Sequence, residues 1–147
     1  MAGSWEATTV IDRPIEEVFG FLADGENDRK FSSRVLEISK TTEGPPGVGT
    51  VYATTVKDAG LKTQHEYKLI DFEAPTRIRW TELSKNLVTV PEGGYDLARD
   101  GDRTRVTIHN TIEGHGAGKL LAPLGLRSAR KGGDDFVKAI KAAVEAS

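Results

Sequence analysis

The sequence predicts an α+β domain in which a seven-stranded antiparallel sheet packs against a long C-terminal helix. Three observations support this fold class. One β-type segment near the N-terminus leads into a helical pattern, six more β-type segments follow with only short turns between them, and the C-terminal segment has helical periodicity. The length of 147 residues fits a single domain spanning residues 1–147, because domains commonly contain roughly 100 to 200 residues.

A first strand is expected over residues 5–11, where side chains follow a period of two. A short helix is expected next, because Asp12 can cap its first turn and Pro14 is tolerated there. The polar stretch 24–30 can hold a second helix, so two short helices are expected between the first two strands. The buried face of the first helix is formed by residues at helical spacing, namely Ile15, Val18, Phe19 and Leu22.

Six β-type segments separated by turn residues fill residues 33–113. The connections, such as residues 44–49 and 99–102, are short enough for hairpins, and no helix-length insertion separates the segments. Neighbouring strands are therefore expected to be antiparallel. The expected strands span residues 34–42, 50–57, 61–72, 76–83, 87–98 and 103–113.

A helix is expected over residues 118–146. Toward its N-terminus the inner face carries small side chains at Gly133, Ala129 and Ala122. Small residues there either leave room for an apolar ligand pocket under the helix or let its backbone pack closely on the sheet, and both alternatives stay open. The second half carries the apolar stripe that must lie against the sheet, formed by Phe136, Val137, Ile140 and Val144.

The composition restricts the classes of function. The chain has 20 Lys and Arg against 22 Asp and Glu, and this net charge of −2 does not give the positive field that nucleic-acid binding usually requires. The absence of cysteine excludes disulfides, thiol catalysis and thiolate zinc sites. No membrane span or secretory leader is recognised, so a cytoplasmic location is expected. His65, His109 and His115 lack metal-ligand spacing, so we expect no metal and no cofactor.

Four motifs carry a family resemblance: VIDRPIEEVFGFL at 10–22, GVGT at 47–50, IDFEAPTRIRW at 70–80 and YDLARDGDRTRVTI at 95–108. Together with the order of elements, they resemble the START-like, or SRPBCC, superfamily over essentially the whole chain. The branch that they resemble most is the polyketide cyclase/dehydrase branch. The resemblance implies a helix-grip fold, in which a curved sheet wraps around the C-terminal helix and leaves a cavity between them.

The resemblance also implies that Thr63, His65, Tyr67 and Leu69 of the fourth strand face this cavity. Related aromatase/cyclases carry an inward arginine on that strand, and the usual W-P motif follows their first helices. Leu69 replaces the arginine here and the W-P motif is absent, which counts against aromatase chemistry. His65 and Tyr67 form the candidate catalytic pair, because an imidazole and a phenol can donate, accept or relay a proton. The alternative is that His65 faces solvent and Tyr67 only packs.

Alternation on the later strands adds further candidates. Asn110 stands among aliphatic residues, and a buried amide must find partners or cost about 1 to 3 kcal/mol. Glu82 lies on the same face of its strand as Trp80. We expect Glu82 at the end of the strand, in water. The alternative is that its carboxyl lies near apolar surface, which would raise its pKa. The candidate ligand-binding residues are Thr63, His65, Tyr67, Leu69, Ile78, Trp80, Tyr95, Ile108, Asn110 and Ala129.

Three functions follow from these features. The first is binding of a small hydrophobic molecule that is polyketide-, lipid- or aromatic-like, and no stable membrane insertion is expected. The second is catalysis as a polyketide cyclase, aromatase or dehydratase. The missing arginine favours the first function over the second. The third is a protein-interaction module. The protein is expected to be a monomer or homodimer. The stretch 119–131 contains no acidic residue and four basic ones, namely Lys119, Arg127, Arg130 and Lys131. This stretch either binds an acidic protein partner or is simply a solvated helix face.

Overall fold

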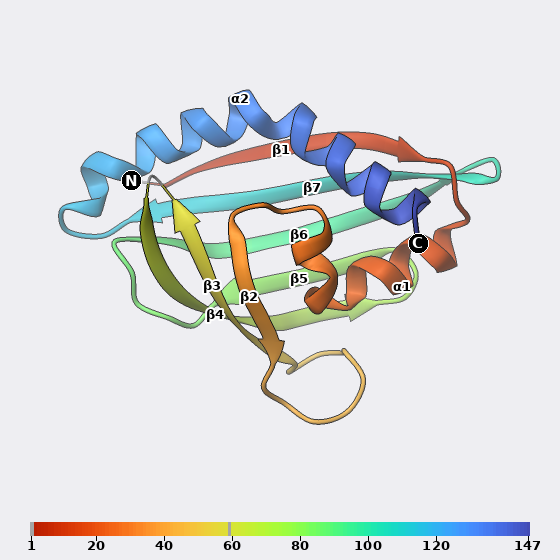
Figure 1. Ribbon diagram of the computed structural model, residues 1–147, viewed down its shortest axis with the longest axis horizontal. Coiled ribbons are helices and arrows are strands. Elements are labelled where there is room, and N and C mark those ends of the chain that lie inside the picture. Colours follow the sequence, from red (N-terminus) through yellow and green to blue (C-terminus); the bar gives the residue numbers. More distant parts are fainter. Residues whose placement is uncertain (1, 59) are drawn as a thin grey trace.

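The computed structural model describes residues 2–58 and 60–147, and its elements follow one another in the predicted order (Figure 1). The ends of the six strands after the short helices lie within two residues of their expected positions. The elements are β1 (Ala2–Ile11), α1 (Ile15–Ala23), the 3-10 helix η1 (Gly25–Lys30), β2 (Val35–Lys40), β3 (Val51–Asp58), β4 (Leu61–Glu73), β5 (Arg77–Glu82), β6 (Val88–Asp100), β7 (Arg103–Gly114) and α2 (Gly118–Glu145).

The seven strands form one antiparallel sheet in the order β1-β7-β6-β5-β4-β3-β2. Strands β2 to β7 pair with their neighbours in the chain, whereas β1 pairs along its length with β7. The sheet is curved, and the helices lie on its concave side, with α2 running along β1 and β7 (Figure 1). This arrangement confirms the predicted fold class.

The core forms where α1 and the second half of α2 meet the sheet. Ile11 of β1, Val106 of β7 and Ile140 of α2 are almost completely buried. Burial of one such side chain stabilises the fold by about 1.5–3 kcal/mol. The apolar stripe in the second half of α2 therefore fixes the helix to the sheet and sets the width of the concave side.

The small residues of α2 bring the helix close to the sheet. A Cβ added to Gly133 would lie 3.3 Å from the Cβ of Ala7, and one added to Gly118 would lie 1.8 Å from the carbonyl oxygen of Leu87. Only glycine allows the second approach. Of the two alternatives left open by the sequence, close backbone packing is what the structure has at Gly133, and Gly118 adds a second close approach that the sequence did not indicate.

The start of α1 differs from the expectation that Asp12 caps the helix. Pro14 occupies the N-cap position, and no side chain caps the first turn. The main-chain N–H of Asp12 instead donates to Glu145 at the end of α2, across 2.8 Å, and Arg13 donates to the carbonyl oxygen of the same residue. Residues 12–13 are thus held by hydrogen bonds to the end of α2, and the side chain of Asp12 does not cap α1.

Candidate functional site

A row of side chains crosses the concave face from β1 to β5. The strand register aligns Trp5 with Asn110, Asn110 with Gly93, and Gly93 with Trp80. The indole Nε1 of Trp80 donates to Oδ1 of Asn110 across 3.0 Å. A Cβ on Gly93 would lie 2.0 Å from that oxygen, so glycine is what permits the contact. Trp80 therefore satisfies the amide whose partner the sequence left open.

Several aromatic side chains on this side are only half-buried. Trp80 packs edge-on against Tyr95, with ring centroids 5.2 Å apart, and Trp5 packs in the same manner against Phe136 of α2. Phe31, which follows η1, extends this contact, since its ring centroid lies 5.7 Å from that of Phe136. The concave side therefore presents apolar surface that remains partly accessible to solvent.

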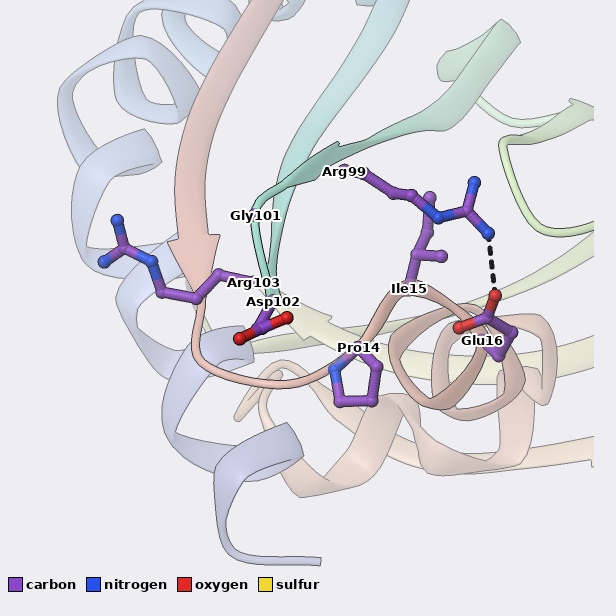
Figure 2. A pocket seen from close by; sticks show the side chains of 7 residues that line it. All are labelled: Pro14, Ile15, Glu16, Arg99, Gly101, Asp102 and Arg103. Atoms are coloured by element: carbon purple, nitrogen blue, oxygen red, sulfur yellow. Dashed lines mark hydrogen bonds and ion pairs between the residues drawn. The ribbon is translucent and has the colours of Figure 1, made fainter.

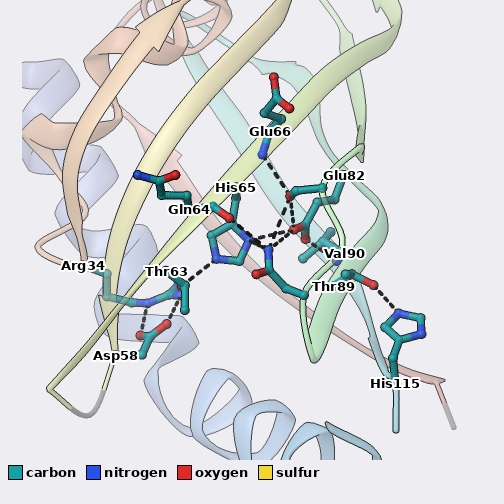
Figure 3. Close-up of polar contacts among 12 residues, drawn as sticks. Arg34, Asp58, Thr63, Gln64, His65, Glu66, Glu82, Thr89, Val90 and His115 are labelled. Carbon is teal, nitrogen blue, oxygen red and sulfur yellow. Dashed lines mark hydrogen bonds and ion pairs between the residues drawn. The ribbon is translucent and has the colours of Figure 1, made fainter.

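His65 and Glu82 form a polar cluster on the same side (Figure 3). Nδ1 of His65 lies 2.7 Å from Oε2 of Glu82, and Nε2 of His65 lies 2.8 Å from Oγ1 of Thr63. The side chains of His65 and Glu82 are only 12% and 1% exposed. Thr63 and His65 share a face of β4 because strand side chains repeat every second residue, and Glu82 reaches them from the end of β5.

Glu82 is buried, so the expectation that it lies in water is wrong. Ser84, Asn86 and the main-chain N–H of Val90 donate to its carboxylate across 2.6, 3.1 and 2.9 Å. Burial alone would raise the pKa of Glu82, but these donors and His65 together hold that pKa below its usual value. Because the ionised carboxylate can only accept, we assign the proton to Nδ1 of His65, which leaves Nε2 as an acceptor.

Tyr67 lies beside His65, with the two rings stacked and their centroids 6.0 Å apart. Burial raises the pKa of Tyr67, and the charge of Glu82 adds to this effect, so the phenol keeps its proton at neutral pH. Of the three tyrosine hydroxyls, only that of Tyr52 has a hydrogen-bond partner among the described residues. Tyr67 therefore carries a free O–H donor close to the imidazole.

The hydroxyl of Tyr95 indicates open space on the concave side. In the described part of the chain, every fully enclosed side-chain nitrogen or oxygen has a hydrogen-bond partner. Tyr95 is only 5% exposed and its hydroxyl has no such partner. The hydroxyl must therefore adjoin space that water can enter, next to the inward face of β6.

The remaining candidates divide into two groups. Leu69, Ile78 and Ile108 are buried in the core. Thr63 is exposed at the end of the His65 cluster, and Ala129 is half-buried on α2. The first group supports the floor of the concave side, and the second borders it.

Ser84 and Asn86 donate to Glu82, yet neither residue is expected at the site from the sequence. They follow β5 in a turn, where serine and asparagine are common for conformational reasons alone. The only sequence signal that bears on them is their closeness to a carboxylate at a strand end, and that signal does not reveal that the turn folds back over Glu82.

Two hollows are present at the surface, and the second reaches His65 and Ser84 of the polar cluster. One of about 370 Å³ lies where the start of α1 meets the β6–β7 turn, beside an ion pair between Arg99 and Glu16 (Figure 2). The other, of about 680 Å³, is lined by residues of η1, β2, β3 and β4 and by Ser84. Its lining includes Thr54 and His65, which face inward, as well as Glu37 and Gln64, which alternate with inward-facing residues.

The histidines stand apart from one another. His109 lies 3.6 Å from Asp96, and His115 contacts Thr89 across 2.7 Å. Within residues 2–58 and 60–147, no three His, Asp or Glu side chains gather in an arrangement that could hold a metal ion. Over the same residues, no helix is both long and apolar enough to span a membrane.

Comparison with solved structures shows the fold. The chain is similar to TTHA0849 from Thermus thermophilus, with 20% identity and a TM-score of 0.82 over 98% of both chains. It is similar to the Zhui aromatase/cyclase from Streptomyces sp. R1128, with 17% identity and a TM-score of 0.82 over 99% of this chain and 94% of that one. A START superfamily protein from Mycobacterium smegmatis matches with 15% identity and a TM-score of 0.81 over 97% of both chains.

The family is shown by a match to the sequence itself. No curated protein matches the chain. A family model described as "Polyketide cyclase / dehydrase and lipid transport" matches residues 3–145, almost the whole length. The chain therefore belongs to the polyketide cyclase/dehydrase and lipid transport family.

Proposed function

We propose that the protein binds a small, mostly apolar molecule, polyketide-, lipid- or aromatic-like, between α2 and the concave face of the sheet. The observation that carries this proposal is the unpartnered hydroxyl of Tyr95, which adjoins open space although the residue is 5% exposed. Half-buried Trp5 and Trp80 supply apolar contact on the same side. A ligand that buries about 200 Å² of apolar surface there gains about 5 kcal/mol before ordering costs.

Titration with an apolar fluorescent probe tests this function. Ala129 is half-buried on α2, whereas the neighbouring Ser128 is exposed. Ala129→Trp should occupy part of the space and weaken probe binding at least about tenfold. Ser128→Trp adds the same side chain outside the site and should bind as wild type does. Equal binding by all three proteins, or binding by none, contradicts the proposal; thermal melting shows that both variants fold.

The geometry around His65 favours a second candidate function, acid–base catalysis on a carbonyl-bearing ligand, as in a cyclase or dehydratase. Glu82 accepts the Nδ1 proton, and Nε2 faces the hydroxyl of Thr63. In this proposal the ligand displaces that hydroxyl, and Nε2 removes a proton from the carbon next to the carbonyl. The imidazolium, stabilised by Glu82, then protonates the departing hydroxyl, so that a carbon–carbon double bond forms and water leaves. The O–H of Tyr67 donates to the carbonyl oxygen.

Incubation with β-hydroxyketone compounds tests the catalytic candidate, with mass spectrometry as the readout for loss of water. His65→Ala should abolish the product, while His109→Ala, on the outer face beside Asp96, should retain it. Tyr67→Phe removes only the hydroxyl and should slow turnover about tenfold or more. Absence of product with wild type, or unchanged turnover in His65→Ala, contradicts catalysis by His65 without affecting the binding function.

A separate interaction is proposed for the first half of α2, with an acidic protein partner. Leu120 and Leu124 are 80% and 65% exposed there, and residues 119–131 contain no acidic side chain. An exposed apolar and basic face suits an acidic amphipathic helix. Charge reversal at two of the basic residues should abolish binding of an acidic helical peptide, and unchanged binding contradicts the proposal. The basic residues are Lys119, Arg127, Arg130 and Lys131.

A further inference from the structure

The side-chain amide of Asn110 has a polar half that the fold does not use. Its oxygen, Oδ1, accepts from the indole Nε1 of Trp80 across 3.0 Å. Because an indole nitrogen can only donate, this contact fixes which end of the amide is the oxygen and which is Nδ2. Within residues 2–58 and 60–147, no hydrogen bond reaches Nδ2. Asn110 therefore carries two N–H donors without an acceptor.

These donors lie beside open space on the concave side. Every fully enclosed side-chain nitrogen or oxygen in the described residues has a hydrogen-bond partner, so Nδ2, which has none, must adjoin space that water can enter. Asn110 is itself half-buried, and it shares a face of β7 with Ile108, which is only 3% exposed in the core. The two donors are therefore available to a ligand that enters between α2 and the sheet.

The amide lies between two indole side chains. Trp5 is paired directly with Asn110 across β1 and β7, and the Cβ atoms of residues paired in this way are about 4.5–5.5 Å apart. The ring of Trp5 packs below α2, because a Cβ added to Gly133 would lie 3.9 Å from it. On the other side, the indole of Trp80 covers Gly93, where an added Cβ would lie 2.3 Å from Nε1. The amide is thus a polar point on an aromatic surface.

The charges around the amide favour a neutral ligand group. The positions that flank the row on the same face, two residues along each strand, carry no charge, namely Ala7, Ile108, Tyr95 and Ile78. Glu82, two residues from Trp80 in the other direction along β5, is acidic. A ligand carboxylate would find no cation here and would be repelled by Glu82, whereas a carbonyl oxygen needs only a donor.

We propose that Nδ2 of Asn110 donates to a carbonyl oxygen of the ligand, whose planar apolar body lies against Trp5 and Trp80. Indole rings gain more from stacked or edge-on contact with another planar ring than from contact with a flexible alkyl chain. The ligand class is therefore an aromatic ketone, one of the classes left open by the proposed function. Trp80 is a positioning residue, because it orients the amide. This inference rests on the proposed ligand-binding function and deepens it.

Two probes of nearly equal shape test the subsite, 2-acetylnaphthalene and 2-isopropenylnaphthalene, of which only the first carries an oxygen. Equilibrium dialysis gives the ratio of the two affinities, and comparing this ratio between proteins cancels the different hydrophobicity of the probes. Asn110→Leu should lower the preference for the ketone at least about tenfold relative to wild type. Asn110→Asp should also lower it at about pH 8, because an ionised carboxylate still accepts from Trp80 but cannot donate.

Two controls separate loss of the donor from loss of the fold. Thr111→Val removes a hydroxyl from the next position of β7, on the outer face, and should keep the wild-type ratio. Continued binding of 2-isopropenylnaphthalene shows that the Asn110 variants fold. Nitrogen-15 NMR of wild type needs no variant to be stable at the site: the ketone should shift the side-chain NH2 signals of Asn110 and the indole signal of Trp80 more than the hydrocarbon does.

Each contrary result has a different meaning. If wild type binds neither probe, the proposed function and the subsite both fail. If both probes bind and Asn110→Leu leaves their ratio unchanged, the subsite alone is overturned. A ratio that falls in Tyr67→Phe or Tyr95→Phe, but not in Asn110→Leu, assigns the carbonyl to a tyrosine hydroxyl and also overturns the subsite. Tighter binding of 2-naphthoate than of 2-acetylnaphthalene overturns recognition of a neutral carbonyl.

Discussion

Two carboxyl groups, Glu82 and Asp28, show how hydrogen bonding decides the effect of burial. Glu82, at the end of β5, accepts from His65 and three further donors, and its pKa lies below the usual value. Asp28, on η1, has no donor among the described residues, and its pKa is raised to about 7. Burial opposes ionisation in both places. Glu82 is thus part of a completed charged network, whereas the carboxyl of Asp28 has no hydrogen-bond donor among the described residues.

The largest effect that tests this contrast is expected from Asp28→Asn. Because the pKa of folded Asp28, about 7, exceeds the ordinary value of 3.8, ionisation opposes folding. The penalty is absent below about pH 3.8, grows through the window up to about 7 and is complete above it. Asparagine does not ionise, so the variant should be more stable than wild type by up to about 4 kcal/mol near pH 8 and by almost nothing near pH 4. Urea unfolding at the two pH values measures this, and equal stability at both contradicts the burial of Asp28.

The opposite sign is expected for Glu82→Ala. Removal of this acceptor leaves the Val90 N–H without a partner and takes away the charged acceptor of His65, so the variant should lose about 3 kcal/mol of unfolding free energy at neutral pH. The wild-type contribution is itself lost as pH falls through the lowered pKa of Glu82. Glu66→Ala, an exposed change on β4, should stay within about 0.5 kcal/mol of wild type. A small loss in Glu82→Ala would show that the network does not stabilise the fold.

A smaller loss is expected from Gly93→Ala, which tests the row of side chains from β1 to β5. The added Cβ would lie 2.0 Å from Oδ1 of Asn110 and 2.3 Å from Nε1 of Trp80, so their hydrogen bond must break. We expect a loss of about 2 kcal/mol and an altered near-ultraviolet circular dichroism spectrum from the displaced indole. Gly125→Ala, in α2 with no atom close to the added Cβ, is the matched control and should not destabilise.

The smallest effect on stability is expected from Thr63→Val. The hydroxyl of this exposed residue contacts Nε2 of His65, and its removal should change unfolding free energy by no more than about 0.5 kcal/mol. The change should nonetheless free Nε2, so that diethyl pyrocarbonate modifies His65 faster than in wild type. His109 provides the internal reference. An unchanged rate at His65 would mean that Thr63 does not shield the nitrogen.

The fold could be predicted because its signals are local and repeated. Strand alternation and short polar turns define the sheet, and the spacing of Phe136, Ile140 and Val144 defines the inner face of α2. What the small residues of α2 do could not be predicted. A glycine such as Gly133 suits a ligand pocket under the helix as well as it suits close packing of the helix on the sheet. Only the distance between helix and sheet distinguishes the two, and this distance is not visible in the sequence.

The two carboxyl groups could not be predicted for the same kind of reason. Glu82 stands at a strand end, where water is the usual surrounding, and the turn with Ser84 and Asn86 that covers it is seen only in three dimensions. Asp28 lies in a polar stretch typical of a loop, and the ring of Tyr52 packs on Gly25 at the start of this stretch. Local sequence contains no signal that distinguishes such a turn or helix from one that lies in solvent.

The most direct test of ligand binding on the concave side uses the three tyrosines of the chain, which all lie there: Tyr52 pairs with Tyr67, Tyr67 stacks on His65, and Tyr95 packs on Trp80. Fluorine NMR of protein labelled with fluorotyrosine, before and after addition of β-naphthol, reports on each ring separately once Tyr→Phe variants assign the signals. Binding between α2 and the sheet predicts shifts at Tyr67 and Tyr95 and a smaller shift at Tyr52, whose hydroxyl is held by Ala23. Signals of Tyr67 and Tyr95 that stay unchanged at saturating probe would contradict it.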